Sequence, residues 1–326
     1  MIEVIMAGML TSVQDHGRKG YRQIGVGLSG AMDDFALSVA NLLLGNPNEA
    51  AALEITLGGC ALKFKSDTTI ALTGTDMKAT LDGHPIPSWW AVSVKADQIL
   101  KMAIAPKGLR SYLAIAGGID VPLIMCSRST DLKAGFGGFN GRALKAGDYV
   151  KVFTSHQQYY LKQGFGISRR LQNESKDSNV VVRILAAAQW NDFSKEAQCL
   201  FLNSPWLVTP QSNRLGYCLS GPVIVAQKQQ ELLSHGILPG CVQMPPSGQP
   251  VIQLNDANTC GGYPKLGVVI EADLRKLAQV RPGESISFQL CTQQQAVQAR
   301  TQLQEQLTSL KLQAESMRKR LSDPLF

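Results

Sequence analysis

The sequence predicts a mainly β fold of the α+β class, with two related β-rich, barrel-like domains in tandem and a C-terminal helix. Three observations predict it. Short β-branched or alternating segments are bounded by turn residues, helical repeats are few, and parts of the first half recur in the second. An antiparallel arrangement agrees better with this pattern than a doubly wound parallel sheet does, since the latter requires strands that alternate with helices.

The predicted strands are short and are spread over most of the chain. They cover residues 53–57, 69–73, 77–81, 89–94, 111–116, 149–153, 180–185, 251–254 and 285–290. Asp82-Gly83 stands between two β segments. Because both residues tolerate the positive φ of a primed turn, a two-residue hairpin is expected there.

Three helices are expected. Residues 32–44 place Phe35, Val39 and Leu43 on one face and end at Gly45-Asn46-Pro47, a common C-terminal stop. A short helix is predicted over 272–278. The last helix, 293–321, repeats Leu303, Leu307, Leu310, Ala314, Met317 and Leu321 at spacings of three and four, a narrow stripe that suits packing on a partner or on its own domain.

Two short motifs recur along the chain. Arg18-Lys19-Gly20-Tyr21 returns as Arg214-Leu215-Gly216-Tyr217, and the turns Lys145-Ala146-Gly147-Asp148 and Arg281-Pro282-Gly283-Glu284 each precede a predicted strand. Chance recurrence of turn chemistry is the alternative. We expect an N-terminal β-rich domain with an insertion over 1–175, a C-terminal barrel domain over 176–290, and an amphipathic helix over 291–326.

Composition narrows the class of protein. The chain has 326 residues, enough for two domains, with 44% hydrophobic residues, 17% charged residues and a net charge of +7. Its basic residues are scattered, with one run at Arg318-Lys319-Arg320, so we expect small anionic ligands and no nucleic acid. The seven cysteines include no C-x-x-C pair, which disfavours a zinc site or a disulfide framework. No secretory signal or membrane-length apolar segment is present, so a cytoplasmic chain without membrane contact is expected.

The densest polar segment is 254–265. Asp256 is a candidate general base or magnesium ligand, and Lys265 is a candidate contact for phosphate or carboxylate. Gly261 and Gly262 let a backbone approach a ligand closely. The alternative is a turn whose Asp and Asn side chains bond their own backbone.

A second polar cluster contains Asn213 and Arg214. An arginine fork can hold a carboxylate in a bidentate manner, and an Asn amide can donate to a developing oxyanion. Polar turns without chemical function look the same in sequence. Together with Asp256, these two residues are the catalytic candidates.

Other polar segments supply binding candidates. Ser129 and Thr130 follow Arg128 ahead of a glycine-rich stretch that lacks the Gly-Lys-Ser/Thr ending of a P-loop. Near the N-terminus, Ser29 or Asp33 is expected to cap the first helix. The full set of substrate- or nucleotide-binding candidates is Asp15, Arg18, Arg128, Ser129, Thr130, Tyr217, Gln243, Gly261, Gly262, Tyr263 and Lys265. No metal ligand set is assigned.

Many longer runs match one family. They include Gln211-Ser212-Asn213-Arg214-Leu215-Gly216-Tyr217 and Gly261-Gly262-Tyr263-Pro264, with further runs at 7–15, 29–33, 40–46, 53–58, 112–122, 129–131 and 231–236. On these runs the chain resembles the family of the C subunit of the bacterial ATP-dependent 5-oxoprolinase. That family was once labelled allophanate hydrolase subunit 2 and is related to carboxyltransferase domains of urea carboxylase.

The resemblance implies cyclophilin-like β-barrel domains and a hydrolase that is active only within a complex. The B and A subunits of 5-oxoprolinase would be the partners, and 5-oxoproline would be opened to L-glutamate with ATP hydrolysis through a phosphorylated lactam. ATP, with Mg²⁺, is the implied nucleotide, and no covalently bound biotin is expected. The resemblance also implies that the Asn213–Arg214 cluster and the 256–265 loop face one pocket.

The sequence departs from the family pattern at three cysteines. Cys126 stands where the family usually has Gly, Cys218 where an Arg commonly stands, and Cys260 where a Thr precedes the paired glycines. Two other functions remain open. One is a carboxyltransferase module of a biotin-dependent urea or amide carboxylase, and the other is a regulatory antagonist of a kinase inhibitor.

Overall fold

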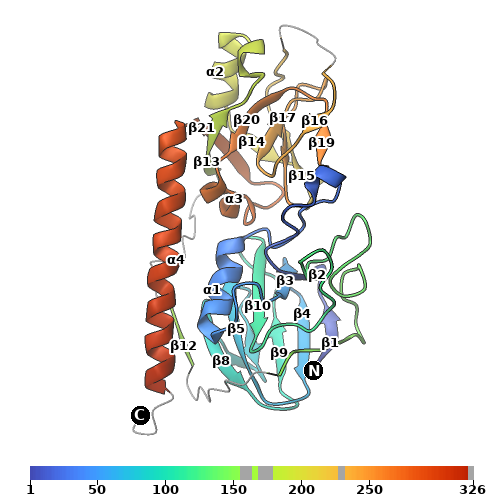
Figure 1. Ribbon diagram of the computed structural model, residues 1–326, viewed down its shortest axis with the longest axis vertical. Coiled ribbons are helices and arrows are strands. Elements are labelled where there is room, and N and C mark those ends of the chain that lie inside the picture. The colour runs from blue at the N-terminus through green and yellow to red at the C-terminus, as the bar shows by residue number, and fades with distance from the viewer. Residues whose placement is uncertain (155–163, 168–178, 227–231, 322–326) are drawn as a thin grey trace. The chain divides into compact units, whose positions relative to one another are not determined.

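The computed structural model describes residues 1–154, 164–167, 179–226 and 232–321 (Figure 1). The chain divides into two compact units. The first comprises residues 1–18, 29–174 and 304–326, and the second comprises 19–28 and 175–303. This division differs from the expected one in two respects: residues 19–28 belong to the second unit, and the C-terminal helix is divided between both units.

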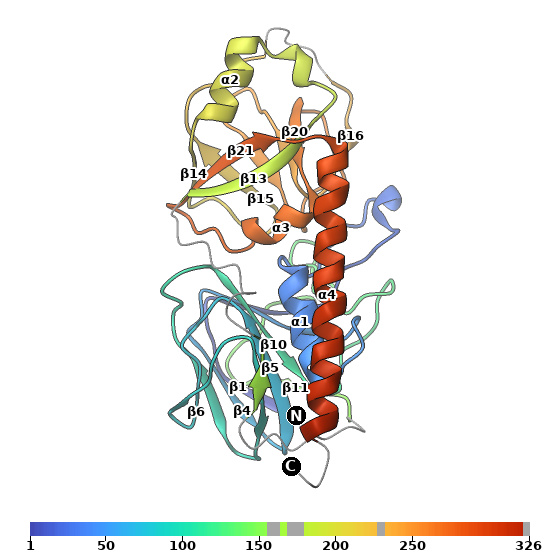
Figure 2. The same cartoon turned by 90° about the vertical axis from the view of Figure 1, so that its left-hand side faces the viewer.

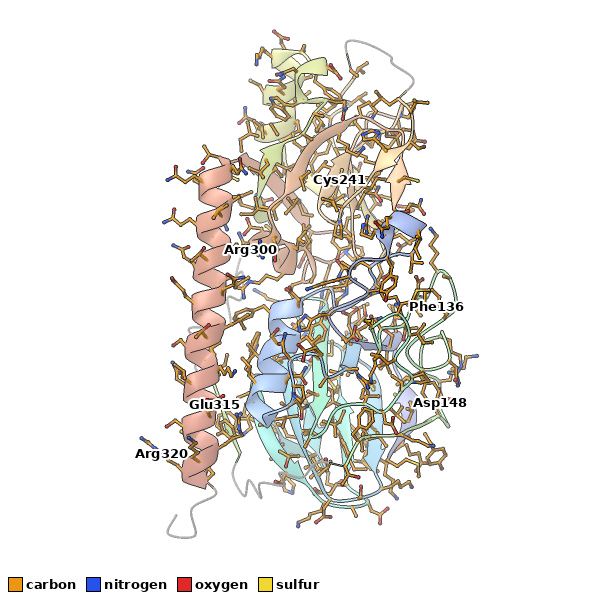
Figure 3. All side chains as sticks on the ribbon, in the orientation of Figure 1. Phe136, Asp148, Cys241, Arg300, Glu315 and Arg320 are labelled. Atoms are coloured by element: carbon orange, nitrogen blue, oxygen red, sulfur yellow. The ribbon has the colours of Figure 1, made fainter. Side chains whose placement is uncertain are left out.

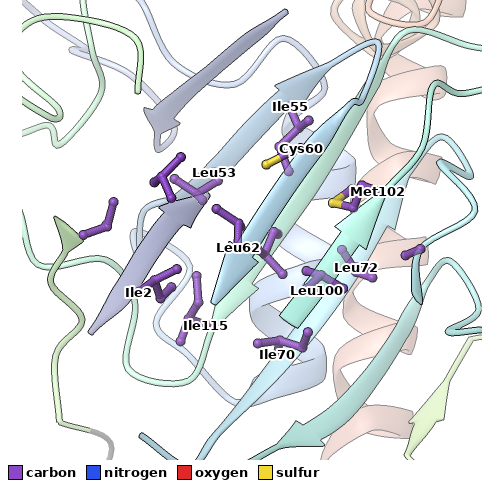
Figure 4. Packing of buried hydrophobic residues seen from close by; sticks show 14 of the residues in the cluster. Ile2, Leu53, Ile55, Cys60, Leu62, Ile70, Leu72, Leu100, Met102 and Ile115 are labelled. Atoms are coloured by element: carbon purple, nitrogen blue, oxygen red, sulfur yellow. The ribbon is translucent and has the colours of Figure 1, made fainter. Parts of the chain in front are cut away.

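Two six-stranded sheets make up the first unit. In one, the order is β11 (Tyr149–Val150), β1 (Ile2–Ala7), β4 (Cys60–Phe64), β9 (Ile99–Met102), β6 (Thr80–Leu81) and β7 (His84–Pro85). In the other, it is β12 (Phe165–Gly166), β8 (Trp90–Val94), β5 (Thr68–Gly74), β10 (Arg110–Ile115), β3 (Ala52–Thr56) and β2 (Leu10–Gln14). Apolar side chains of both sheets, among them Ile2, Leu62, Ile70 and Ile115, form one buried core (Figure 4).

Helix α1 (Asp34–Leu44) confirms the predicted first helix. Its N-cap is Asp33, whose carboxylate accepts a hydrogen bond from the Ala36 amide at 3.0 Å, and it ends at Gly45 with φ 72°. The cap was expected at Ser29 or Asp33, because a side-chain oxygen must satisfy the first amides of a helix. Thr73 of β5 donates to the Ala36 carbonyl at 2.7 Å and thereby attaches α1 to its sheet.

A closed barrel forms the second unit. Its order is β13 (Asn179–Ala186), β20 (Lys265–Val269), β17 (Cys241–Gln243), β18 (Val251–Gln253), β15 (Gly216–Ser220), β14 (Trp206–Val208) and β21 (Ser285–Leu290). The parallel pairing of β13 with β21 closes it. The remaining elements of this unit are η1 (Arg22–Ile24), η3 (Trp190–Asp192), α2 (Lys195–Asn203), α3 (Glu271–Leu277), and the ribbon of β16 (His235–Gly236) and β19 (Cys260–Gly261).

Aromatic side chains anchor α2 to the barrel. Phe201 of α2 stacks on Phe288 of β21 with ring centroids 4.5 Å apart, and it also contacts Trp206 at 5.8 Å. The Trp206 indole donates to the Phe201 carbonyl at 2.9 Å, so its one polar group is satisfied inside the core.

The last helix, α4 (Gln293–Leu321), has the predicted bounds. In the second unit, Ala299 belongs to a small cluster with Ile270. In the first unit, Arg318 is buried and donates to the Leu42 carbonyl near the C-terminal end of α1, beside which α4 lies in both views (Figures 1 and 2). A cation at the end of a helix is favourable because carbonyls there lack helical partners. Arg318 is therefore a packing residue rather than part of an exposed basic run.

The predicted class, mainly β with a barrel and a C-terminal helix, is confirmed. A closed barrel is found only in the second unit among the described residues, since the first unit is a pair of sheets. Strands β6 and β11 are shorter than the predicted 77–81 and 149–153. None of the helices in the described ranges is long and apolar enough to cross a membrane.

The Asp82-Gly83 hairpin is also confirmed. Thr80 pairs with Pro85 and Leu81 with His84, and the two turn residues have φ values of 49° and 85°. Both lie in the left-handed region that a type I′ turn requires.

Two glycines with positive φ give a stability prediction. A Cβ added at Gly58 would lie 2.0 Å from the Ala103 carbonyl oxygen, whereas one at Gly83 would meet nothing within 4 Å. Gly83→Ala should lower the free energy of unfolding by roughly 1 kcal/mol, the cost of the backbone conformation. Gly58→Ala should lower it by roughly 3 kcal/mol or more, because backbone must also move. Urea unfolding of both variants measures the difference, and equal losses would contradict the clash.

Candidate functional site

Two polar turns meet in the second unit. Antiparallel pairing places Gly216 of β15 opposite Gln253 of β18, so the residues that precede β15 lie beside those that follow β18. The Leu254 amide donates to the Leu215 carbonyl at 3.0 Å, and the Asp256 amide donates to the Arg214 carbonyl at 3.1 Å. The two clusters that the sequence selected are therefore neighbours.

A buried ion pair joins these turns. Arg214 donates from Nε to Asp256 Oδ2 at 2.8 Å and from Nη2 to Oδ1 at 2.9 Å, and both side chains are buried. Both carboxylate oxygens thus accept from one guanidinium in a bidentate arrangement. The pair holds the turns in register, and the catalytic roles assigned to Arg214 and Asp256 stay predictions.

Asn213 lies exposed at the tip of the first turn. Its Oδ1 accepts from the Leu215 amide at 2.7 Å, which fixes the orientation of the side-chain amide. Among the residues that the structure describes, the Nδ2 group contacts only the Gln211 carbonyl, at a long distance of 3.4 Å. It therefore retains donor capacity, which is the property that an oxyanion contact needs.

A second polar centre lies on the neighbouring strands. Lys265 begins β20, is 7% exposed, and its Nζ is hydrogen-bonded to His235 Nε2 of β16. His235 Nδ1 contacts the Leu233 carbonyl at 2.9 Å. Because a carbonyl can only accept, Nδ1 carries the proton, and Nε2 accepts from the lysine.

Burial perturbs the titration of this centre. It lowers the pKa of Lys265, against a smaller opposing effect of the Cys241 thiolate. Burial also raises the pKa of the thiol of Cys241, which is labelled in Figure 3, to about 11. Cys241 is therefore protonated at neutral pH, while the proton on Lys265 is held less tightly than on an exposed lysine.

Gln243 adds a buried donor beside Lys265. The two residues are opposite each other in the β17–β20 pairing. Gln243 is 4% exposed and its Oε1 accepts from Gln253 at 2.8 Å, but its Nε2 has no hydrogen-bond partner within the described parts of the chain. A Cβ at Gly261 would lie 3.0 Å from that Nε2 and 2.6 Å from Ile237. Glycine at position 261 therefore permits the close packing around this buried donor.

The remaining binding candidates of the second unit, Gly262, Tyr263 and Tyr217, differ in how exposed they are and in what they contact. Gly262 is opposite the Leu232 carbonyl, which a Cβ would approach to 2.7 Å. Tyr263 is 49% exposed. Tyr217 is buried, and its hydroxyl donates to the Val280 carbonyl at 3.1 Å, an ordinary core contact. None of these contacts tests the binding roles.

Two of the first-unit candidates, Arg128 and Ser129, are hydrogen-bonded to a third, Asp15. Its Oδ1 accepts from the hydroxyls of Ser127 at 2.6 Å and Ser129 at 2.5 Å, and its Oδ2 accepts from the Arg128 amide at 2.5 Å. Asp15 and Ser129 are both buried. This arrangement fixes the backbone around Arg128.

Arg18 and Thr130 are also buried. Arg18 donates to the Ser129 carbonyl, and its guanidinium lies 4.5 Å from the ring centroid of Phe136. Phe136 is labelled in Figure 3. Thr130 donates to the Val13 carbonyl at 3.0 Å. Of the first-unit candidates, Arg128 is the more exposed one, being half-buried.

His235 is not among the binding and catalytic candidates that the sequence analysis named. The structure places it in strand β16. The signal that could have selected it is its pairing with Gly261, which only the β16–β19 register reveals.

No metal centre is formed by three or more His, Cys, Asp and Glu side chains in the described ranges. Mg²⁺ characteristically binds through substrate phosphates with only one or two carboxylates.

The fold and this arrangement of strands define a carboxyltransferase-type protein. The family model described as carboxyltransferase domain, subdomain A and B, matches residues 24–290, and the chain belongs to that family. Cys126 has a φ of 57°, a backbone conformation that glycine adopts without strain. That the family usually has Gly at this position stays a prediction.

The chain is similar to two kinds of named protein, 5-oxoprolinase C subunits and urea carboxylases. It is 44% identical to the 5-oxoprolinase C subunit of Escherichia coli, over 95% of this chain and 97% of the relative. It is 39% identical to the 5-oxoprolinase C subunit of Haemophilus influenzae, over 92% and 94%. The crystal structure of Kluyveromyces lactis urea carboxylase matches with a TM-score of 0.89 and 32% identity, over 95% of this chain and 29% of the other.

The buried ion pair gives a stability prediction. Asp256→Asn should lower the free energy of unfolding by about 3–5 kcal/mol, because it leaves the Arg214 charge buried beside a neutral group. Asp76→Asn, which alters an exposed ion pair with Lys78, is the matched control and should cost under about 1 kcal/mol. Urea unfolding measures both. An unchanged stability of Asp256→Asn would show that the pair does not hold the turns.

The lowered pKa of Lys265 gives a pH prediction. Between the lowered folded-state pKa and the ordinary value of 10.5, the unfolded chain binds more protons, so stability rises with pH. The contribution is fully present above 10.5 and is lost as pH falls through the folded-state pKa. Unfolding free energies of wild type minus Lys265→Met should therefore increase with pH across this window. Parallel pH profiles of the two proteins would contradict the shift.

Proposed function

We propose that the chain is part of an ATP-dependent 5-oxoprolinase and acts in a cytoplasmic complex with the B and A subunits of that enzyme. The observation that carries the proposal is the 44% identity to the 5-oxoprolinase C subunit of Escherichia coli across 97% of that relative. Fold alone could not support it, since related domains also occur in a urea carboxylase.

The proposed reaction activates the lactam carbonyl, which is a poor electrophile. An amide carbonyl resists attack by water, and transfer of the γ-phosphoryl group of ATP to the lactam oxygen, with ADP leaving, makes the carbon more electrophilic. One water then adds at that carbon and the C–N bond breaks, which gives an acyl phosphate. A second water releases phosphate and L-glutamate. In this scheme phosphorylation requires the B subunit, and the activated compound passes to the A subunit.

Residues of the second unit fit the anionic states of this reaction. Lys265 can donate to a phosphoryl or carboxylate oxygen, and the Gln243 amide can donate to the lactam oxygen while charge develops on it. Preorganised donors of this kind stabilise a transition state because they need no reorganisation. Asn213 offers a further donor from the exposed turn.

Reconstitution tests the proposal. With the A and B subunits added, the chain should support 5-oxoproline-dependent ATP hydrolysis and glutamate formation, and each mixture that lacks one component should not. Lys265→Met should lower kcat about a hundredfold, the effect of losing one preorganised donor. Lys195→Met, an exposed lysine of the same unit, is the control. Absence of glutamate in the complete mixture would refute the proposal.

A second candidate function has structural support. The similarity to Kluyveromyces lactis urea carboxylase favours a carboxyltransferase module. Such a module requires a biotinylated carrier on a partner protein. Two results together would favour the carboxyltransferase module over the 5-oxoprolinase subunit. A biotinylated protein should be recovered on avidin together with this chain, and ATP hydrolysis should require both bicarbonate and urea.

A further inference from the structure

A cavity of about 210 Å³ is lined by residues of the first unit. Its described lining includes Arg128, Phe153, Glu49 and the turn at Gly117 and Gly118. One water needs about 10–15 Å³ of such volume, so the cavity has room for a small ligand. It is smaller than the ~300–1,000 Å³ of sites for drug-sized ligands, so it suits a single amino acid and not a nucleotide.

The walls of this cavity are fixed by hydrogen bonds. Asn46 accepts from the Gly117 amide at 2.9 Å and donates to the Ile115 carbonyl at 2.8 Å. The Phe153 amide donates to the Gly118 carbonyl at 3.1 Å. A site held in this way is preformed, so a ligand would not have to order it on binding.

Arg128 is held in place while part of its guanidinium is left unsatisfied. Its backbone amide donates to Asp15, and its guanidinium lies 5.1 Å from the ring centroid of Phe153. Its Nε is buried and has no hydrogen-bond partner in the described structure. A buried donor without a partner is costly. Within the described structure the Arg128 guanidinium forms no ion pair and no side-chain hydrogen bond, so its charge is available to an anionic ligand in the cavity that Arg128 lines.

A strained turn precedes Arg128. Ile124 and Ser127 exchange backbone hydrogen bonds around Met125 and Cys126, whose φ values are 51° and 57°. Two successive non-glycine residues in this region are unfavourable and persist only where the surroundings enforce them. The strain accompanies the placement of Arg128 and agrees with a functional use of that residue.

Glu49 supplies the opposite charge. It is exposed and lines the same cavity, and no ion pair between Glu49 and Arg128 is present in the described part of the chain. A cation and an anion that line one cavity without contact leave room for a ligand that carries both charges. Because the two lining charges cancel, a phosphate dianion is matched less well than a zwitterion.

We propose that this cavity binds a free α-amino acid, with its carboxylate on Arg128, its ammonium near Glu49 and its side chain against Phe153. The site is separate in its residues from Lys265 and Gln243 of the second unit. The proposal does not rest on the proposed enzyme function, because binding is measured on the isolated chain.

Calorimetric titration with L-glutamate and with glutarate, which lacks the ammonium, tests the proposal. Wild type should bind L-glutamate more tightly than glutarate. Arg128→Gln should weaken L-glutamate binding about tenfold or more. Glu49→Gln should remove the preference for L-glutamate over glutarate. Arg142→Gln is the matched control, since Arg142 also lies 5.1 Å from a phenyl ring, that of Phe139, yet pairs with Asp148 outside the cavity.

Three results would overturn the inference: no binding of either compound by wild type, equal binding of the two, or binding abolished by Lys265→Met but unaffected by Arg128→Gln. The last result would place the amino acid in the second unit. Circular dichroism establishes that each variant is folded. If Arg128→Gln does not fold, Glu49→Gln decides, because that side chain is exposed.

Discussion

The parallel pairing of β13 with β21 is the constraint on which the second unit depends. It joins Asn179 to Ser285, far apart in the sequence, and closes the barrel. Closure fixes β15, β18, β17 and β20 as successive neighbours. Because each strand then has a set register, the Arg214 turn meets the Asp256 turn, and Gln243 meets Lys265. The polar centre is therefore a consequence of barrel closure and not of any one loop.

Each unit uses a buried carboxylate to order a polar loop. Asp256 accepts both bonds of the Arg214 fork, and Asp15 accepts from Ser127, Ser129 and the Arg128 amide. Burying a carboxylate is costly unless hydrogen-bond donors satisfy its oxygens. A buried pair therefore adds little net folding stability, and its main effect is to fix the positions of the loops that it joins. Two other side chains, those of Gln243 and Arg128, have a buried nitrogen without a hydrogen-bond partner in the described structure, and they are the groups suited to a ligand.

The sequence allowed much of the fold to be predicted because the relevant signals are local. Asp33, Gly45 and the Asp82-Gly83 turn act within four residues of themselves, and the structure confirms each. The two units could not be delimited in the same way. Residues 19–28 join the second unit through contacts such as the Arg22 bond to the Ile237 carbonyl, a partner that no local pattern indicates.

By itself, the sequence determined the class of fold, fewer than half of the strands that the structure describes, and the three expected helices, because periodicity, capping and turn chemistry are properties of neighbouring residues. It also selected Arg214 and Asp256 as notable. Only the tertiary structure decided that they pair with each other, that His235 bonds Lys265, and that Arg128 rather than Asp15 or Arg18 lines a cavity. The physical reason is that partner choice and burial depend on strand register and barrel closure, which join residues that no sequence window contains together.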